Sequence, residues 1–248
     1  ATTALTETVD VDAVGLSDSL VTVTPAEYGN AVLLTIRIRT DDFLIGFDAD
    51  VANLLNYNMV DTIDRLARNA LDAGGTEVTH TATAETDITA SDDITVALVR
   101  QQRAALRKAS VMPWDGSSYG AVIHPDVAYD LKSETGDGSW TAAAQYSDAS
   151  RIWNDEIGTY ANVRFIESPR AKINTDGGAS SVDTYTTYFF GQEMLAKAES
   201  IAPHMVLGPV TDKLMRFQPL GWHTYAGWSV LRSAALRRLI TASTIGSN

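Results

Sequence analysis

The sequence predicts an α+β fold. Strand-like and helix-like stretches are mixed along the 248 residues, without the regular alternation that builds a parallel α/β sheet. Alternating β-branched residues dominate the first 40 positions, and an apolar pattern with helical spacing follows over residues 48–73. Because 45% of the residues are apolar, the chain can bury a core as one large domain or as two interleaved domains.

The opening segment, residues 1–40, is expected to form strands. Its alternating residues include Val9, Val11, Val21, Val23, Val32, Leu34, Ile36 and Ile38, with turns expected at residues 15–18 and 25–30. Two strands of about 12–15 residues would reach roughly 40–50 Å, whereas a compact chain of this length has a radius of gyration of about 18 Å. An isolated hairpin is only marginally stable, so we expect this segment to lie on a neighbouring molecule.

A long helix is predicted over residues 48–73. Apolar residues recur there at three- and four-residue spacing, namely Val51, Leu54, Leu55, Met59, Ile63, Leu66, Ala70 and Leu71. Asp48 can cap its start, and Gly74 with Gly75 can end it. A helix of about 26 residues is near 39 Å long, enough to cross a subunit of this size.

Shorter elements fill the remainder of the chain. A strand with a loop is expected at 77–87. Further strands are expected at 119–123, 163–167, 184–190, 214–217 and 222–240, although 229–239 fits a helix equally well. The helices are expected from a cap at Ser91 or Asp92 to Lys108, over 125–132 and near 147–154, and the polar loops at 136–140 and 174–181.

Composition excludes several classes of function. The net charge of -12 and an acidic, lysine-free start disfavour gripping of a phosphate backbone. The absence of cysteine excludes disulfides and thiolate chemistry. No run of about 18 apolar residues and no secretory signal occurs, so no membrane partner is expected.

Local motifs predict no catalytic, cofactor-binding or metal site. The sequence contains no G-x-S-x-G, no P-loop and no G-x-G-x-x-G after a strand. Its histidines are widely separated, at His80, His124, His204 and His223, and none has the i, i+4 spacing of a helical zinc site. The paired carboxylates, such as Asp41/Asp42 and Asp92/Asp93, are explained by helix caps and turns.

His124-Pro125-Asp126 is the sharpest tripeptide in the chain. Its letters match those of co-chaperone domains, but here it follows a strand, and Pro125 suits the first turn of a helix. An enzymatic alternative would assemble His124, Asp126 and Ser117 into a hydrolase or binding site, with no local motif to support it. Among the tryptophans, Trp222 and Trp228 are expected in the core and Trp140 at an interface.

Three stretches together resemble the major capsid proteins of tailed bacteriophages, whose Hong Kong-type fold is shared with encapsulin shells. They are residues 119–131 (YGAVIHPDVAYDL), residues 154–167 (NDEIGTYANVRFIE) and the terminal segment from Gly221 through Trp228 to Ile240. The first two resemble the central strand, helix and following strand of that family's axial domain. The order of segments is similar over essentially the whole chain.

The resemblance implies a domain organisation. Residues 1–39 correspond to an extended loop, residues 40–92 and 205–248 to a peripheral domain with spine helix 48–73, and residues 93–204 to an axial domain. Family members carry an N-terminal arm before the extended loop; here the chain starts at or inside that loop, because the arm is processed away, lies outside the chain or is aligned differently. Residues 1–40 contain no lysine, so the isopeptide cross-link of some members is not expected.

The resemblance also implies function. The chain would be a non-enzymatic shell subunit that assembles through pentamers and hexamers into an icosahedral virion capsid around double-stranded DNA, in the host bacterial cytoplasm. Scaffold, portal and decoration proteins are the implied partners. The alternative with the same fold is an encapsulin-type compartment that encloses a cargo enzyme.

Overall fold

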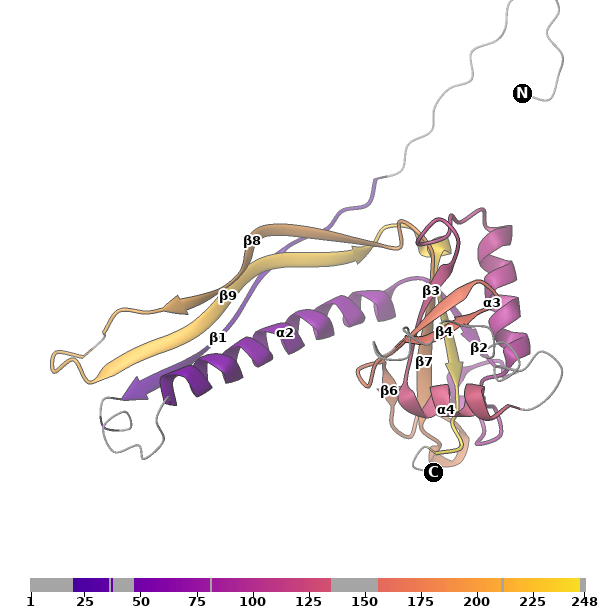
Figure 1. Ribbon diagram of the computed structural model, residues 1–248, viewed down its shortest axis with the longest axis horizontal. Coiled ribbons are helices and arrows are strands. Elements are labelled where there is room, and N and C mark those ends of the chain that lie inside the picture. Colours follow the sequence, from indigo (N-terminus) through magenta and orange to yellow (C-terminus); the bar gives the residue numbers. More distant parts are fainter. Residues whose placement is uncertain are drawn as a thin grey trace, which may run out of the picture.

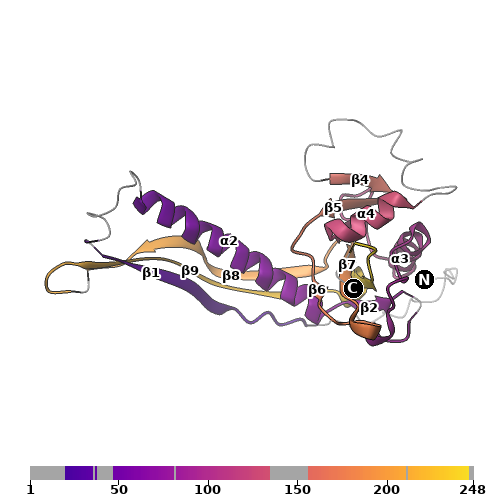
Figure 2. The same ribbon diagram turned by 90° about the horizontal axis from the view of Figure 1, so that it is seen from below.

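The computed structural model describes residues 20–35, 37, 47–80, 82–134, 156–210 and 212–245. These residues form two parts, a long arm and a more compact body from which the arm projects (Figures 1 and 2). Each part contains its own β-sheet, and β8, β9 and α2 run from the body along the arm.

The arm is a three-stranded antiparallel sheet with one helix along it. The strand order is β1 (Ala26–Thr35), β9 (Phe217–Val230), β8 (Leu195–Leu207). Helix α2 (Phe47–Ala73) packs mainly against β9, the central strand. Since a strand alternates its side chains between two faces, α2 covers one face of this sheet and leaves the other without a layer.

The body is built on a seven-stranded mixed sheet. Its order is β2 (Thr76–Thr79), β10 (Leu236–Thr241), β7 (Thr184–Phe190), β3 (Tyr119–Ile123), β5 (Val163–Glu167) and β4 (Glu156–Tyr160), and β6 (Ile173–Asn174) pairs with β7. Two helices pack with it, α3 (Val96–Lys108) and α4 (Pro125–Ser133). Short 3₁₀ turns lie at Glu85–Asp87, Ala179–Ser181 and Ser233–Ala235.

The main core lies in the body. All seven residues of β7 are buried, as expected for a strand in the middle of a sheet covered on both faces. The largest fully buried side chains include Phe165, Phe189, Leu106, Ile123 and Leu131, which come from β5, β7, α3, β3 and α4. The rings of Phe165 and Phe189 meet edge to face with centroids 6.0 Å apart, a favourable arrangement for aromatic pairs.

Several elements predicted from the sequence are confirmed. The long helix occupies Phe47–Ala73 and ends at Gly75, whose φ of +77° is a conformation that glycine adopts without strain. Strands 119–123, 163–167 and 184–190 and the helix after His124 are present. The ambiguous stretch 229–239 is strand apart from the turn at Ser233–Ala235.

Other expectations are wrong. The turn at residues 25–30 is instead the start of β1, because Gly29 and Asn30 pair with His223 and Trp222 of β9. Neither Ser91 nor Asp92 caps α3; Thr95 does, accepting from the Leu98 N–H, while the Asp92 carboxylate closes a turn by accepting from the Thr89 N–H.

Residues 77–87 were expected as a strand with a loop, and they contain both: β2 stops at Thr79, and a 3₁₀ turn follows at Glu85–Asp87. One strand was missed. Strand β8 was not predicted at all, because Leu195–Leu207 lacks a clean alternation of apolar and polar residues and contains Pro203. Its residues are mostly exposed, so the local pattern carries no burial signal.

The sheets divide the chain at different points from the expected domain boundaries. Strand β8 begins at Leu195 and belongs to the arm, although residues 93–204 were expected together. Strand β10 (Leu236–Thr241) joins the body, although residues 205–248 were expected with the long helix. Strand β1 pairs with β9 and is part of the arm sheet.

Some expectations fall outside the described residues. They are the first strand of the opening segment within residues 1–19, the loop at 136–140 with Trp140, and the helical segment near 147–154 with Trp153.

Candidate functional site

Polar contacts in the interior of the arm lock its helix to its sheet. The Trp222 indole N–H of β9 donates to the Asn58 Oδ1 of α2 at 3.0 Å, and the Asn30 side chain of β1 donates to the same oxygen at 3.3 Å. Leu34 and Leu55 are buried beside this contact layer. One side-chain amide therefore ties three elements together, and it fixes which face of β9 points toward α2.

The outward side of α2 carries apolar side chains without a covering layer. Leu54, Tyr57 and Val60 are 64%, 64% and 55% exposed. Their three-residue spacing puts them on the same side of the helix. Leu54 and Leu55 both belong to the apolar pattern that predicted the helix, but only Leu55 is buried. Large apolar residues gathered on a free surface are typical of an interaction site.

The outer face of the arm sheet, opposite α2, is the second open surface. Since Trp222 points toward the helix, Gly221 and His223 point away from it. Small residues floor a shallow hollow of about 590 Å³ on this face. Its lining residues are Gly29, Asn30, Ala31, Val206, Gly208, Pro219, Gly221, Trp222 and His223. Leu33 of β1, beside the hollow, is 52% exposed, so this face also carries a large apolar side chain.

The tip of the arm, between β8 and β9, is also apolar. It lies at the end of the arm far from the body (Figure 1). Leu214 and Met215 are 70% and 68% exposed, and Leu207 and Val210 are exposed as well. Exposed apolar side chains on a protruding tip are typical of a surface that contacts another molecule.

A network of charged and aromatic residues joins the arm to the body. Arg170 of the body forms an ion pair with Asp61 of α2 and donates to the Tyr57 hydroxyl at 3.0 Å. Arg68 of α2 donates in return to the Arg170 carbonyl at 2.9 Å. Contacts made in both directions between two elements hold the arm at one angle to the body.

A second contact strengthens this joint closer to the core. The Tyr188 hydroxyl of β7 donates to the Asp72 carboxylate near the end of α2, and Lys172 lies 3.9 Å from the same carboxylate. Burial and the neighbouring Asp72 raise the pKa of the Tyr188 phenol, so it remains a hydrogen-bond donor at any physiological pH.

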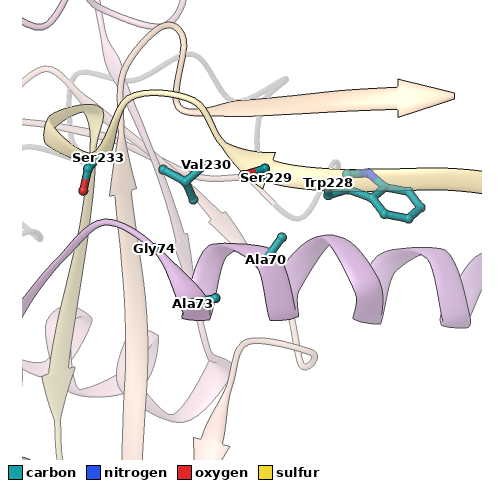
Figure 3. A pocket seen from close by; sticks show the side chains of 7 residues that line it. All are labelled: Ala70, Ala73, Gly74, Trp228, Ser229, Val230 and Ser233. Carbon is teal, nitrogen blue, oxygen red and sulfur yellow. The ribbon is translucent and has the colours of Figure 1, made fainter. Parts of the chain in front are cut away.

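The root of the arm contains a small cavity of about 280 Å³. Figure 3 shows its lining residues, which are Ala70, Ala73, Gly74, Trp228, Ser229, Val230 and Ser233. A Cβ atom on Gly74 would lie 2.4 Å from a Val230 methyl group, so α2 can approach β9 this closely only with glycine there. The side chains that line it are small or apolar, apart from the hydroxyls of Ser229 and Ser233 and the indole of Trp228.

The structure keeps apart the residues of the enzymatic alternative. Ser117 precedes β3 and His124 follows it, so about 15 Å of strand separates them. Ser117 donates instead to Asp115, and the His124 ring lies 3.3 Å from Asp126 and caps α4. Asp126 accepts from the Tyr185 hydroxyl. Burial and this hydrogen bond raise the pKa of the Tyr185 phenol to about 12. No nucleophile is paired with a base at this site.

The remaining site tests concern metals and membranes. Within the described ranges, no cluster of three or more histidine and carboxylate side chains is placed to hold a metal ion. In the same ranges, no helix combines the length and the apolar character needed to span a bilayer. Trp222 is buried, as expected, whereas Trp228 is only partly covered.

An arm that is locked internally, fixed to a body and apolar on its outside defines a structural building block of a larger assembly. Comparisons with known proteins agree with this class. The family model described as phage capsid protein matches residues 19–217, and the chain belongs to that family. No curated protein matches the sequence.

Solved structures of phage capsids share the fold. The capsid of Ralstonia phage GP4 has a TM-score of 0.72 at 14% identity, with 91% of this chain and 76% of that chain covered. The cyanophage Pam1 capsid has a TM-score of 0.71 at 16% identity, covering 98% and 82%. Mycobacterium phage Che8 has a TM-score of 0.61 at 19% identity, covering 96% and 78%. The predicted α+β fold of a tailed-phage major capsid protein is confirmed, and the protein is a structural component of a virion capsid.

Proposed function

We propose that this chain assembles with copies of itself, through pentamers and hexamers, into a closed icosahedral shell around double-stranded phage DNA. The observation that carries this proposal is the arm: its helix side, its outer sheet face and its tip all present apolar side chains that no other described residue covers. Many modest contacts of this kind, repeated by symmetry, give a strong shell through multivalency.

In this proposal the two parts of the molecule have different tasks. The arm corresponds to the peripheral domain with α2 as its spine, together with the extended loop of residues 1–39, which contains β1. The body corresponds to the axial domain. Arg170, Asp61 and Tyr57 would fix the angle between them, and that angle helps to set how neighbouring subunits meet.

The chemistry of the chain supports a role without catalysis. His124, Asp126 and Ser117 are not all brought together, and the net charge of -12 suits a wall that confines DNA without gripping it. Assembly would take place in the host bacterial cytoplasm. Scaffold and portal proteins, with a decoration protein as a further candidate, would be the accessory partners.

Negative-stain electron microscopy with sedimentation velocity, on the purified chain over a range of concentration and salt, tests the proposal. We expect closed shells or rings of five and six subunits. A chain that stays monomeric even when its scaffold is supplied would contradict the proposal. The contents of the shells, nucleic acid or a cargo enzyme, then separate a virion from an encapsulin-type compartment.

A variant pair locates the contact. The double substitution Leu54→Glu with Val60→Glu puts charge on the outward side of α2 and should abolish shells, because burying two unpaired carboxylates is costly. The matched control, Leu54→Met with Val60→Ile, keeps the side apolar and should assemble normally. Both sites are more than half exposed, so both variants should unfold at the same temperature as the parent subunit.

A further inference from the structure

Two histidines face each other across the outer sheet face of the arm. His204 of β8 and His223 of β9 are register partners in the antiparallel ladder, and their ring centroids lie 5.9 Å apart with the planes 87° to one another. Because Trp222 points toward α2, His223 and its partner lie on the opposite, open face of the sheet. Strands β8 and β9 run side by side along the arm there (Figure 1).

One of these rings is held in a defined tautomer. The Nδ1 atom of His204 lies 2.9 Å from the Ala202 carbonyl oxygen. A carbonyl can only accept, so Nδ1 carries the hydrogen and the Nε2 atom of the neutral ring keeps its lone pair. A histidine that donates its other ring N–H to a backbone carbonyl is oriented in the way that metal-binding histidines usually are.

Both rings are accessible to an ion. His204 is exposed, and His223 lines the open hollow of about 590 Å³ on this face. Among the described residues, no hydrogen bond or ion pair occupies the His223 side chain. The other two histidines differ: His80 lies 2.9 Å from Asp92 and His124 lies 3.3 Å from Asp126, both partly buried in the body.

We propose that His204 and His223 together bind one divalent transition-metal ion of the Zn²⁺, Ni²⁺ and Cu²⁺ class through their Nε2 atoms, with water completing the coordination. Imidazole is a preferred ligand for these ions. Two imidazoles on one tetrahedral ion, with nitrogens at about 2.0 Å from it, have ring centres roughly 5 Å apart. The observed centroid separation of 5.9 Å is close to that value, so the two rings are near enough for both Nε2 atoms to reach one ion after side-chain rotation.

The ion would clamp β8 to β9 in the outer half of the arm. In this region the β8–β9 ladder is irregular, with register shifts between Glu199 and Ile201 and between Ile201 and His204. A bridge at the end of that irregular stretch would stabilise the strand pair that leads to the tip. The chain has no cysteine to compete for the ion.

Isothermal titration of the full chain with Zn²⁺ and with Ni²⁺, in metal-free buffer near pH 7.5, tests the proposal. We expect one ion per chain. The substitution His204→Asn keeps a side-chain N–H for the Ala202 carbonyl but removes the distal nitrogen, and His223→Asn removes its partner. Each should weaken binding at least about tenfold. His80→Asn removes a histidine outside the pair and should leave the affinity unchanged.

Electron paramagnetic resonance of the Cu²⁺ complex gives an independent readout. The parent chain should show two bound imidazole nitrogens and each single variant only one. Unfolding curves in metal-free buffer check that the variants are folded, and His223→Gln replaces His223→Asn if the latter is destabilised. Affinity that is unchanged in His204→Asn and in the folded His223 variant, or a spectrum with one nitrogen in the parent chain, would overturn the proposal.

Discussion

The arm and the body of this capsid subunit differ in how far they bury their large apolar side chains. The body buries its large apolar side chains within its own chain, around a β7 strand in which every residue is covered. The arm has a sheet with a helix on one face only, and it exposes apolar residues on the helix, on the open sheet face and at the tip. Among the described residues the body therefore holds the main buried core, whereas the arm exposes large apolar side chains on three of its surfaces.

The largest expected loss of stability comes from a substitution in the core of the body. Phe189→Ala removes a fully buried ring that contacts Phe165, and it should lower the free energy of unfolding of the unassembled subunit by about 3–5 kcal/mol. Leu54→Ala, an apolar truncation of the arm surface, should change it by about 0.5 kcal/mol or less. Urea denaturation of both variants measures the contrast, and equal losses would contradict the division into a closed body and an open arm.

A smaller loss of stability is expected from a substitution at the contact between α2 and the arm sheet. Asn58→Ala removes the acceptor of the Trp222 indole N–H and leaves that buried donor unpaired, which should cost about 1–3 kcal/mol. Asn58→Asp retains an oxygen at the same position and should cost less. Urea denaturation of both variants measures the difference, and an unchanged midpoint in Asn58→Ala would show that this contact does not hold the helix to the sheet.

The joint should matter more for geometry than for stability. Arg170→Met removes the ion pair with Asp61 and the hydrogen bond to Tyr57, but these groups are partly solvated, so the loss should be about 1 kcal/mol or less. Because the arm angle is then less restricted, electron microscopy should show malformed or heterogeneous shells. Lys132→Met, which removes a longer ion pair to Glu167 within the body, is the control and should leave shell shape unchanged.

The smallest expected effect is a pH dependence located at His124. Burial lowers the pKa of the His124 imidazole in the folded chain. The unfolded chain then binds more protons, so the stability contributed by the neutral ring is complete above about pH 6.5 and falls as the pH drops below that value. His124→Asn keeps a helix-capping side chain and should flatten this decline between about pH 6.5 and 5. Thermal unfolding across that range, compared with His80→Asn, checks it.

The success of the sequence-based predictions depends on whether an element is buried within its own chain. Strands 119–123, 163–167 and 184–190 were predictable because they contain buried apolar residues in short runs. The long helix was predictable because apolar residues recur at helical spacing along it. Strand β8 was missed because its side chains are mostly exposed, and the 25–30 turn was wrong because Gly29 and Asn30 pair with a strand almost 200 positions away. Local patterns report burial within the chain and carry little information about surfaces that a neighbour covers.

The candidate surfaces were only partly visible in the sequence. Leu54, Tyr57 and Val60 make α2 apolar on a second side, but the apolar spacing that predicts the helix does not separate exposed Leu54 from buried Leu55. The hollow on the outer sheet face depends on the pairing of Ala31 with Gly221 and of Gly29 with His223. Those registers join distant segments, so spacing along the chain cannot reveal them.

Hydrogen exchange on unassembled subunits and on assembled shells tests the central claim most directly. The account predicts that assembly strongly slows exchange in the arm, in β1, in the outer parts of β8 and β9 and in the middle of α2, while β3 and β7 of the body are protected to the same degree in both states. Shells in which the arm exchanges as fast as in the free subunit, with added protection confined to the body, would contradict it.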